Sequence, residues 1–151
     1  MTSTILPLVI GGKDVQTTET FDVVNPGTGE LVQKSSSAGV AEAVLAADAA
    51  AAAFPGWSGT HVNERRAILL KANGVLEARS EEIKTILQKE TGCDAAWADI
   101  NFASAAENLV YATSHIVNLE GRMPTVGNPC RQAMIAREPY GVVFSVVPWY
   151  V

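Results

Sequence analysis

Two cysteines and two histidines are the first candidates for a nucleophile, a base or a zinc ligand in this sequence. They are Cys93, Cys130, His61 and His115. A catalytic thiolate needs a neighbouring base or cation that lowers its pKa, and neither cysteine has one nearby in the sequence. Zinc sites usually show Cys-x-x-Cys or His-x3-His spacing, which these four residues lack. We therefore expect no catalytic cysteine and no metal site here.

Composition and charge argue against several classes of protein. The chain has 151 residues, 48% of them hydrophobic, which is enough to build one domain. The net charge is −5 and the 11 Lys and Arg residues are scattered, so a nucleic-acid partner is not expected. No stretch approaches the roughly 20 apolar residues that span a membrane, and no basic region precedes the apolar residues 5–10. We expect a cytoplasmic protein with reduced thiols and no secretory signal.

The elements that must position any site begin with short strands. Alternating apolar residues predict strands at residues 8–10, 21–24 and 31–35. Glycine, proline and asparagine predict turns between them, at residues 11–14 and 25–30.

Helical spacing of apolar residues begins at Val40 and predicts three long helices. The first has Ser37 as its N-cap and ends at Pro55-Gly56. The second spans about residues 64–90, with a cap and a break near Ser80, and ends before Gly92.

The third helix is expected at about residues 94–118. One face carries Trp97, Ile100, Ala103, Ala106, Val110, Thr113 and Val117. Trp97 on this face is interpreted as a core residue rather than a cofactor-stacking one. His115 is expected on the flank of the helix, and His61 in solvent at the start of the second helix.

The last part of the chain is predicted to be extended. Residues 121–130 read as a loop and residues 132–137 as a strand. Residues 141–147 are uncharged and almost wholly apolar, which is typical of a strand covered on both faces in a parallel α/β sheet.

Short motifs along most of this length occur in the order in which one enzyme family carries them. They are Asn25-Pro26-Gly27-Thr28-Gly29-Glu30, Phe54-Pro55-Gly56-Trp57-Ser58, Glu64-Arg65-Arg66, Glu90-Thr91-Gly92, Tyr111-Ala112, Arg137-Glu138-Pro139-Tyr140-Gly141-Val142-Val143 and Val146-Val147-Pro148-Trp149. Together they resemble the N-terminal segment of the NAD(P)-dependent aldehyde dehydrogenases. The Glu-Pro-Tyr-Gly-Val variant is reminiscent of members that act on aromatic aldehydes, such as salicylaldehyde and vanillin dehydrogenases.

The resemblance implies an α/β fold, the N-terminal part of the aldehyde dehydrogenase fold. It would contain hairpin strands, three long helices and the first strand of the cofactor-binding sheet. Residues 1–151 would form part of the N-terminal, NAD(P)-binding domain with no second domain. About residues 121–140 would contribute to the arm through which the intact family forms homo-oligomers.

The resemblance also implies oxidation of an aldehyde to a carboxylic acid with NAD or NADP. Val146, Val147, Pro148 and Trp149 would line part of the nicotinamide and ribose pocket. Tyr150 stands where the family has an oxyanion-binding Asn, and the family's nucleophilic Cys and general base come later in its sequence. We therefore expect that the chain stops before the catalytic residues, contributes none itself and is inactive alone.

Two other interpretations stay open. The chain could be a non-enzymatic module that docks onto intact homologues through its helices or its strand. It could also be a small autonomous enzyme that uses Cys93 or Cys130. Self-association or aggregation is expected in any case, because residues 141–147 are built to be covered. Substrate identity and the choice between NAD and NADP stay undecided.

The codons of the last three residues suggest why the sequence has Tyr150 where the family has an Asn. Trp149, Tyr150 and Val151 are encoded by TGG-TAY-GTN, where Y is T or C. From the third base this reads GTAYGT, the form of a eukaryotic splice donor. We expect a translated intron start, and an acceptor exon beginning G-AAY would restore Trp followed by Asn. The alternative is a nonsense mutation or an expression boundary.

Overall fold

Two small sheets form the N-terminal part of the molecule. The computed structural model describes residues 5–128 and 130–147. β5 (Leu31–Ser36) lies between β1 (Ile5–Leu6), which is parallel to it, and β4 (Thr20–Val24), which is antiparallel. β2 (Leu8–Ile10) and β3 (Lys13–Val15) form a separate antiparallel hairpin. The three strands predicted from the sequence are confirmed, and β1 and β3 are additional.

The β2–β3 turn is shorter than expected. Gly11 and Gly12 both have positive φ, 59° and 75°, as a two-residue type I′ hairpin turn requires. Lys13 and Asp14 were expected in the turn but belong to β3 and pair with Ile10 and Val9. The two adjacent glycines reverse the direction of the chain by themselves, so the residues after them can pair with β2.

Four α-helices follow instead of the expected three. They are α1 (Val40–Gly59), α2 (Val62–Ala78), α3 (Ser80–Thr91) and α4 (Ala95–His115), which continues into a short 3-10 turn, η1 (Ile116–Asn118). The break predicted near Ser80 divides the second stretch into α2 and α3 at Arg79. Gly92 ends α3 in a left-handed conformation with φ of 71°, as predicted.

Both ends of α1 differ from the prediction. Gly39, not Ser37, is the N-cap, and its N–H donates to the Glu42 carboxylate at 2.8 Å. Pro55 lies inside the helix rather than at its end. A proline inside a helix removes the hydrogen bond that its own N–H would donate to the carbonyl four residues earlier. The last turn also gains partners, because Thr60 Oγ1 donates to the Gly56 carbonyl and Arg65 donates to the Ser58 carbonyl.

The buried face of α4 agrees only in part with the one that the sequence pattern indicated. Ala106 and Thr113 belong to the predicted face and are buried, on a side on which α2 and α3 pack, whereas Ala98 was not predicted. Trp97 was expected in the core, but it is 45% exposed. The buried positions on this helix carry small side chains, which allow α2 and α3 to pack closely.

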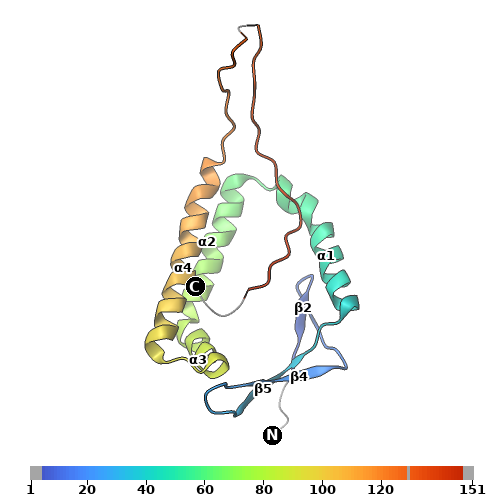
Figure 1. The fold of residues 1–151 in the computed structure, drawn as a ribbon, viewed down its shortest axis with the longest axis vertical. Helices are drawn as coiled ribbons and strands as arrows, with labels where there is room; N and C mark the ends of the chain where they lie inside the picture. The colour runs from blue at the N-terminus through green and yellow to red at the C-terminus, as the bar shows by residue number, and fades with distance from the viewer. Residues whose placement is uncertain (1–4, 129, 148–151) are drawn as a thin grey trace.

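α1 lies on one side of the molecule, and α2 and α4 lie together on the other, with β4 and β5 at one end (Figure 1). None of the described residues of α1 is buried. The accessible surface is 11597 Å², whereas a compact monomer of this mass would expose about 7,400 Å². The open arrangement therefore leaves about 4,200 Å² more surface in water than a compact domain of this size.

The chain after η1 extends away as a long arm and returns between α1 and the other helices (Figure 1). In the arm, Arg122 and Ile135 form an isolated antiparallel bridge, with N–H···O distances of 3.0 and 2.8 Å. The strands predicted at residues 132–137 and 141–147 do not form in the part of the chain that is described. A strand needs a neighbour that shares a ladder of hydrogen bonds with it. Residues 132–137 have only the single bridge at Ile135, and no described residue pairs with residues 141–147.

No helix in the described ranges is both long enough and apolar enough to cross a membrane.

Candidate functional site

Both cysteines lie in loops. Cys93 is half-buried between Gly92, which ends α3, and Asp94, the N-cap of α4. Its backbone N–H donates to Thr91 Oγ1 at 3.3 Å. Cys130 is exposed, and its N–H donates to Asn128 Oδ1 at 2.9 Å. At both positions the hydrogen bond described is made by the backbone N–H group, and the expectation that neither cysteine is a nucleophile stays a prediction.

The two histidines occupy the positions predicted from the sequence. His61 is exposed at the N-cap of α2, where its Nδ1 accepts from the Asn63 N–H at 3.3 Å. His115 lies at the end of α4, and its ring meets the edge of the Tyr111 ring with centroids 4.5 Å apart. In the residues that the structure describes, no three His, Cys, Asp or Glu side chains come together as a metal site would require.

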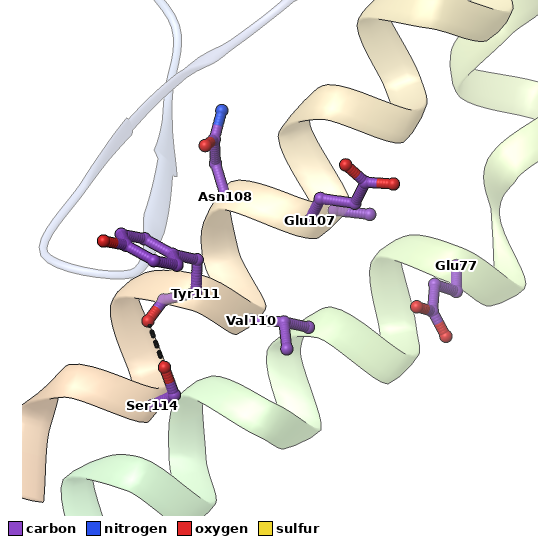
Figure 2. Close-up of a pocket in the computed structure, with 7 residues that line it drawn as sticks. Glu77, Glu107, Asn108, Val110, Tyr111 and Ser114 are labelled. Carbon is purple, nitrogen blue, oxygen red and sulfur yellow. Dashed lines mark hydrogen bonds between the residues drawn. The ribbon is translucent and has the colours of Figure 1, made fainter.

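A shallow hollow of about 620 Å³ lies between α2 and α4. Its lining combines two carboxylates, from Glu77 on α2 and Glu107 on α4, with the aromatic ring of Tyr111 (Figure 2). The Ser114 hydroxyl donates to the Tyr111 backbone carbonyl at 2.7 Å. The remaining lining residues are Ala106, Asn108 and Val110. We call this feature the α2–α4 hollow; no nucleophile is paired with a base in its lining.

Asn73 is the polar residue below this surface that sequence reasoning did not find. It is 6% exposed, donates through Nδ2 to Glu77 Oε1 at 2.9 Å, and has a buried Oδ1 without a hydrogen-bond partner. A lone polar residue on a helix gives no sequence signal that it faces inward. Buried polar atoms without partners are uncommon, and Asn73 restrains Glu77 rather than forming a site of its own.

Ion pairs link the helices outside the hollow. The Lys84 ammonium on α3 donates to Asp99 on α4 at 2.8 Å and to Glu81 at 2.6 Å, and these contacts raise the pKa of Lys84. At the α2–α3 junction the hydrogen bond from Arg79 lowers the pKa of Glu82. The Lys84–Asp99 pair links α3 to α4, whereas the Arg79–Glu82 pair is local to the start of α3. None of these residues lines the α2–α4 hollow.

The residues predicted to line a cofactor lie at the end of the extended segment. Val146 and Val147 are 83% and 82% exposed. Pro148, Trp149 and Tyr150 lie outside the described residues. The start of the segment, Gly141 to Val143, faces Ala50, Ala53, Phe54 and Trp57 of α1 across a hollow of about 280 Å³. The structure thus brings this segment next to α1, not next to either cysteine.

The sequence profile described as "Aldehyde dehydrogenase family" matches residues 13–151. The chain belongs to the aldehyde dehydrogenase family. The match spans the motifs from the turn at residues 25–30 to the Pro148-Trp149 pair, so the resemblance read from these motifs is confirmed.

Similar aldehyde dehydrogenases include enzymes named for aromatic substrates. A vanillin dehydrogenase from Pseudomonas sp. strain HR199 is 38% identical over 146 residues, which are 95% of this chain and 30% of that protein. The solved salicylaldehyde dehydrogenase from Pseudomonas putida G7, complexed with salicylaldehyde, is 28% identical with a TM-score of 0.83. That match covers 89% of this chain and 28% of the solved one.

A third similar protein is the NAD-dependent benzaldehyde dehydrogenase from Corynebacterium glutamicum, with 28% identity and a TM-score of 0.74. It is matched over 82% of this chain and 28% of the solved chain. The chain therefore spans under a third of the length of the relatives it matches. Its fold is the α/β arrangement of the N-terminal part of an aldehyde dehydrogenase.

Proposed function

We propose that this chain supplies the N-terminal part of the cofactor domain of an enzyme that oxidises an aromatic aldehyde to a carboxylic acid with NAD(P)+. The observation that carries the proposal is the 38% identity to a vanillin dehydrogenase over 95% of the chain. The Glu138-Pro139-Tyr140-Gly141-Val142 segment supports the aromatic substrate class, because this variant resembles members that act on aromatic aldehydes. The cofactor would take the hydride from the substrate.

The cofactor-facing part of the proposal concerns Val146 and Val147, with Pro148 and Trp149 after them. The two valines are exposed and lie in an uncharged segment, which fits an apolar wall against a nicotinamide ring. Phosphate groups need clustered backbone N–H groups or cations, and residues 141–147 contain no charged side chain. These residues would therefore form one wall of the pocket, with phosphate binding left to other parts of an intact enzyme.

The arm after η1 is proposed to be the oligomerisation arm of an intact enzyme. Met123 and Met134 are 71% and 78% exposed on either side of the Arg122–Ile135 bridge. Exposed methionines on a projecting two-stranded segment fit a surface that packs against another subunit.

The test compares two polypeptides. The first consists of these 151 residues, and the second is a chimaera in which residues 13–147 replace the matching segment of the vanillin dehydrogenase from Pseudomonas sp. strain HR199. Each is mixed with vanillin, salicylaldehyde or benzaldehyde and with NAD+ or NADP+, and formation of the reduced cofactor is followed by absorbance. We expect activity from the second polypeptide and none from the first. A chimaera that folds but oxidises none of these aldehydes would overturn the proposal that these residues supply this part of such an enzyme.

The second candidate function is a non-enzymatic module that docks onto intact homologues. Its support is the absence of any buried residue among the described residues of α1, since a long helix normally covers an apolar face. Mixing the 151-residue chain with an intact vanillin dehydrogenase tests this function. Co-elution in gel filtration supports docking, and separate elution at micromolar concentrations rules it out.

A further inference from the structure

Two unfavourable residues lie side by side in the middle of α2. Among the described residues of α2, Asn73 alone is buried, and its Oδ1 has no hydrogen-bond partner. Gly74 follows it, and a Cβ at this position would meet nothing within 4 Å. Glycine inside a helix costs stability relative to alanine, and neither a positive φ nor a close contact requires it there. The pair therefore weakens the middle of α2.

The order of these two residues also has a chemical consequence. Of the asparagines in the sequence, only Asn73 is followed by glycine. In such a pair the backbone nitrogen of the glycine can attack the carboxamide carbon of the asparagine. Glycine has no Cβ to hinder the approach, and it reaches backbone conformations that other residues avoid. Because both reacting groups belong to one chain, the reaction needs the right geometry but no enzyme.

We propose that Asn73 is deamidated by the Gly74 backbone nitrogen when the middle of α2 opens, and that the closed helix prevents the reaction. The Gly74 N–H gives its proton to hydroxide, this nitrogen forms a bond to Asn73 Cγ, and the bond from Cγ to Nδ2 breaks. Nδ2 takes up a proton from water and leaves as ammonia. Water then opens the resulting succinimide ring at either carbonyl, which leaves aspartate or isoaspartate at position 73. No group is oxidised or reduced.

The closed helix keeps the reacting groups from each other and from water. In an α-helix the N–H of Gly74 is engaged with the carbonyl four residues earlier, and ring closure requires the backbone of Asn73 to rotate out of the helical conformation. The carboxamide of Asn73 is also restrained, because Nδ2 donates to Glu77 Oε1 at 2.9 Å. At 6% exposure, the side chain is largely covered from hydroxide and water. The reaction therefore requires a local opening of α2.

The product does not fit the closed helix. An aspartate at position 73 would place a carboxylate oxygen where Nδ2 now donates to Glu77, so a hydrogen bond would be replaced by two facing negative charges. Like charges in a covered place are unfavourable. An isoaspartate would also add a carbon atom to the backbone and interrupt the helical hydrogen bonds. Deamidation thus turns a reversible opening of α2 into a permanent loss of its packing.

Mass spectrometry of the 151-residue chain tests the proposal. Incubation in water enriched in oxygen-18 labels the hydrolysis product, and cleavage after Lys71 and Arg79 then releases residues 72–79. A synthetic peptide of residues 70–77, too short for a stable helix, gives the unprotected rate. We expect conversion at Asn73 in both, about ten to a thousand times slower in the chain, because the reactive state is a local opening. Amide exchange at Gly74 should be slowed by a similar factor.

Substitutions separate the chemistry from the opening. Gly74→Ala should slow conversion about tenfold or more in the peptide, where no helix has to open. In the chain, Glu77→Ala releases the carboxamide of Asn73 and should speed conversion about two- to tenfold. Glu107→Ala is the matched control, because Glu107 lines the same α2–α4 hollow while Asn73 donates to Glu77. It should leave the rate unchanged.

Several outcomes contradict the proposal. Equal rates in chain and peptide would mean that the closed helix gives no protection, and a chain rate below the expected range would mean that the reaction does not accompany opening of α2. Equal effects of Glu77→Ala and Glu107→Ala would refute the restraint by Glu77. A peptide rate unchanged by Gly74→Ala would refute the role of glycine, as would faster conversion in the guanidinium-unfolded chain at Asn63, which Glu64 follows.

Discussion

Gly92 joins two of the family motifs in space. It lies at the C-terminus of α3 with φ of 71°, against the turn at residues 25–30. A Cβ at this position would lie 3.2 Å from Asn25 Oδ1 and 3.3 Å from the Gly27 backbone nitrogen. The Asn25 carboxamide already accepts from the Gly27 N–H at 2.8 Å. The two motifs are therefore packed together through a contact that only glycine allows.

Gly92→Ala should loosen this contact. The left-handed conformation costs a non-glycine residue about 1–2 kcal/mol, which is a factor of about 5–30 in a local opening equilibrium. We expect faster amide exchange by that factor at Gly29, whose N–H donates to the Asn25 carbonyl, and at the substituted residue 92, bonded to the Gln88 carbonyl. Hydrogen exchange measured by NMR checks this.

The control is Gly74→Ala. Gly74 lies inside α2, and a Cβ there meets nothing within 4 Å. Alanine favours a helix by about 1 kcal/mol over glycine, so exchange within α2 should become slower. If Gly92→Ala also slowed exchange, the tight contact at the α3 terminus would be refuted.

Arg79 and Glu82 form the exposed ion pair at the α2–α3 junction, with Nη2 and Oε1 2.7 Å apart. The hydrogen bond lowers the pKa of Glu82 in the folded chain. The contribution of the pair to stability is therefore present above the unfolded pKa, about 4.3, and is lost as pH falls through the lower, folded pKa. We expect Arg79→Met to raise the NMR titration midpoint of the Glu82 carboxyl, and Arg66→Met on α2 to leave it unchanged.

At the scale of elements, the arm depends on a close approach of its two sides. A Cβ on Gly121 would lie 2.6 Å from the Ile135 carbonyl oxygen, which accepts from the Arg122 N–H. We expect Gly121→Ala to break the bridge, so that the amides of Arg122 and Ile135 exchange at nearly unprotected rates. Gly127 lies farther along the arm, where a Cβ meets nothing within 4 Å. Gly127→Ala should leave both amides unchanged, and equal effects of the two substitutions would refute the role of Gly121.

Elements that depend on nearby residues could be predicted from the sequence, and those that depend on distant neighbours could not. Gly92 as a helix terminator and the break before Ser80 are determined by neighbours within a few residues. Whether residues 141–147 form a strand depends on a partner strand, which no local pattern supplies. Trp97 was wrongly expected in the core, because helical spacing shows that a face is apolar but not which apolar face is covered.

The same difference between local and distant interactions decides which parts of the candidate site could be predicted. The motifs identified the family, since their order along the chain is a property of sequence alone. The roles of Val146 and Val147 stay predictions, because a cofactor wall is defined by what lies opposite it. Asn73 was missed, since nothing in the spacing of α2 marks a polar residue as buried.

On the scale of the whole molecule, the small hydrophobic core limits the cooperativity of unfolding. Among the described residues only Leu87, Ala98 and Ala106 are buried apolar residues, and two of these are alanines. Removing a buried leucine commonly costs about 2–5 kcal/mol, and the total stability of a domain is only about 5–15 kcal/mol. A chain with one large buried apolar side chain has little reserve against such a loss.

We therefore expect the 151-residue polypeptide to retain its helices but to unfold gradually. Far-ultraviolet circular dichroism should show helix, while the near-ultraviolet signal stays weak and the dye ANS binds to the exposed apolar surface. The circular dichroism signal should change over a broad range of urea concentrations. The reason is that the slope of the free energy of unfolding against urea concentration follows the surface that folding removes from water. Measurement at several dilutions separates this behaviour from any contribution of self-association. A sharp transition at such dilution, with a slope normal for 151 residues and without ANS binding, would mean that the open arrangement of α1 and the other helices is not the state in solution.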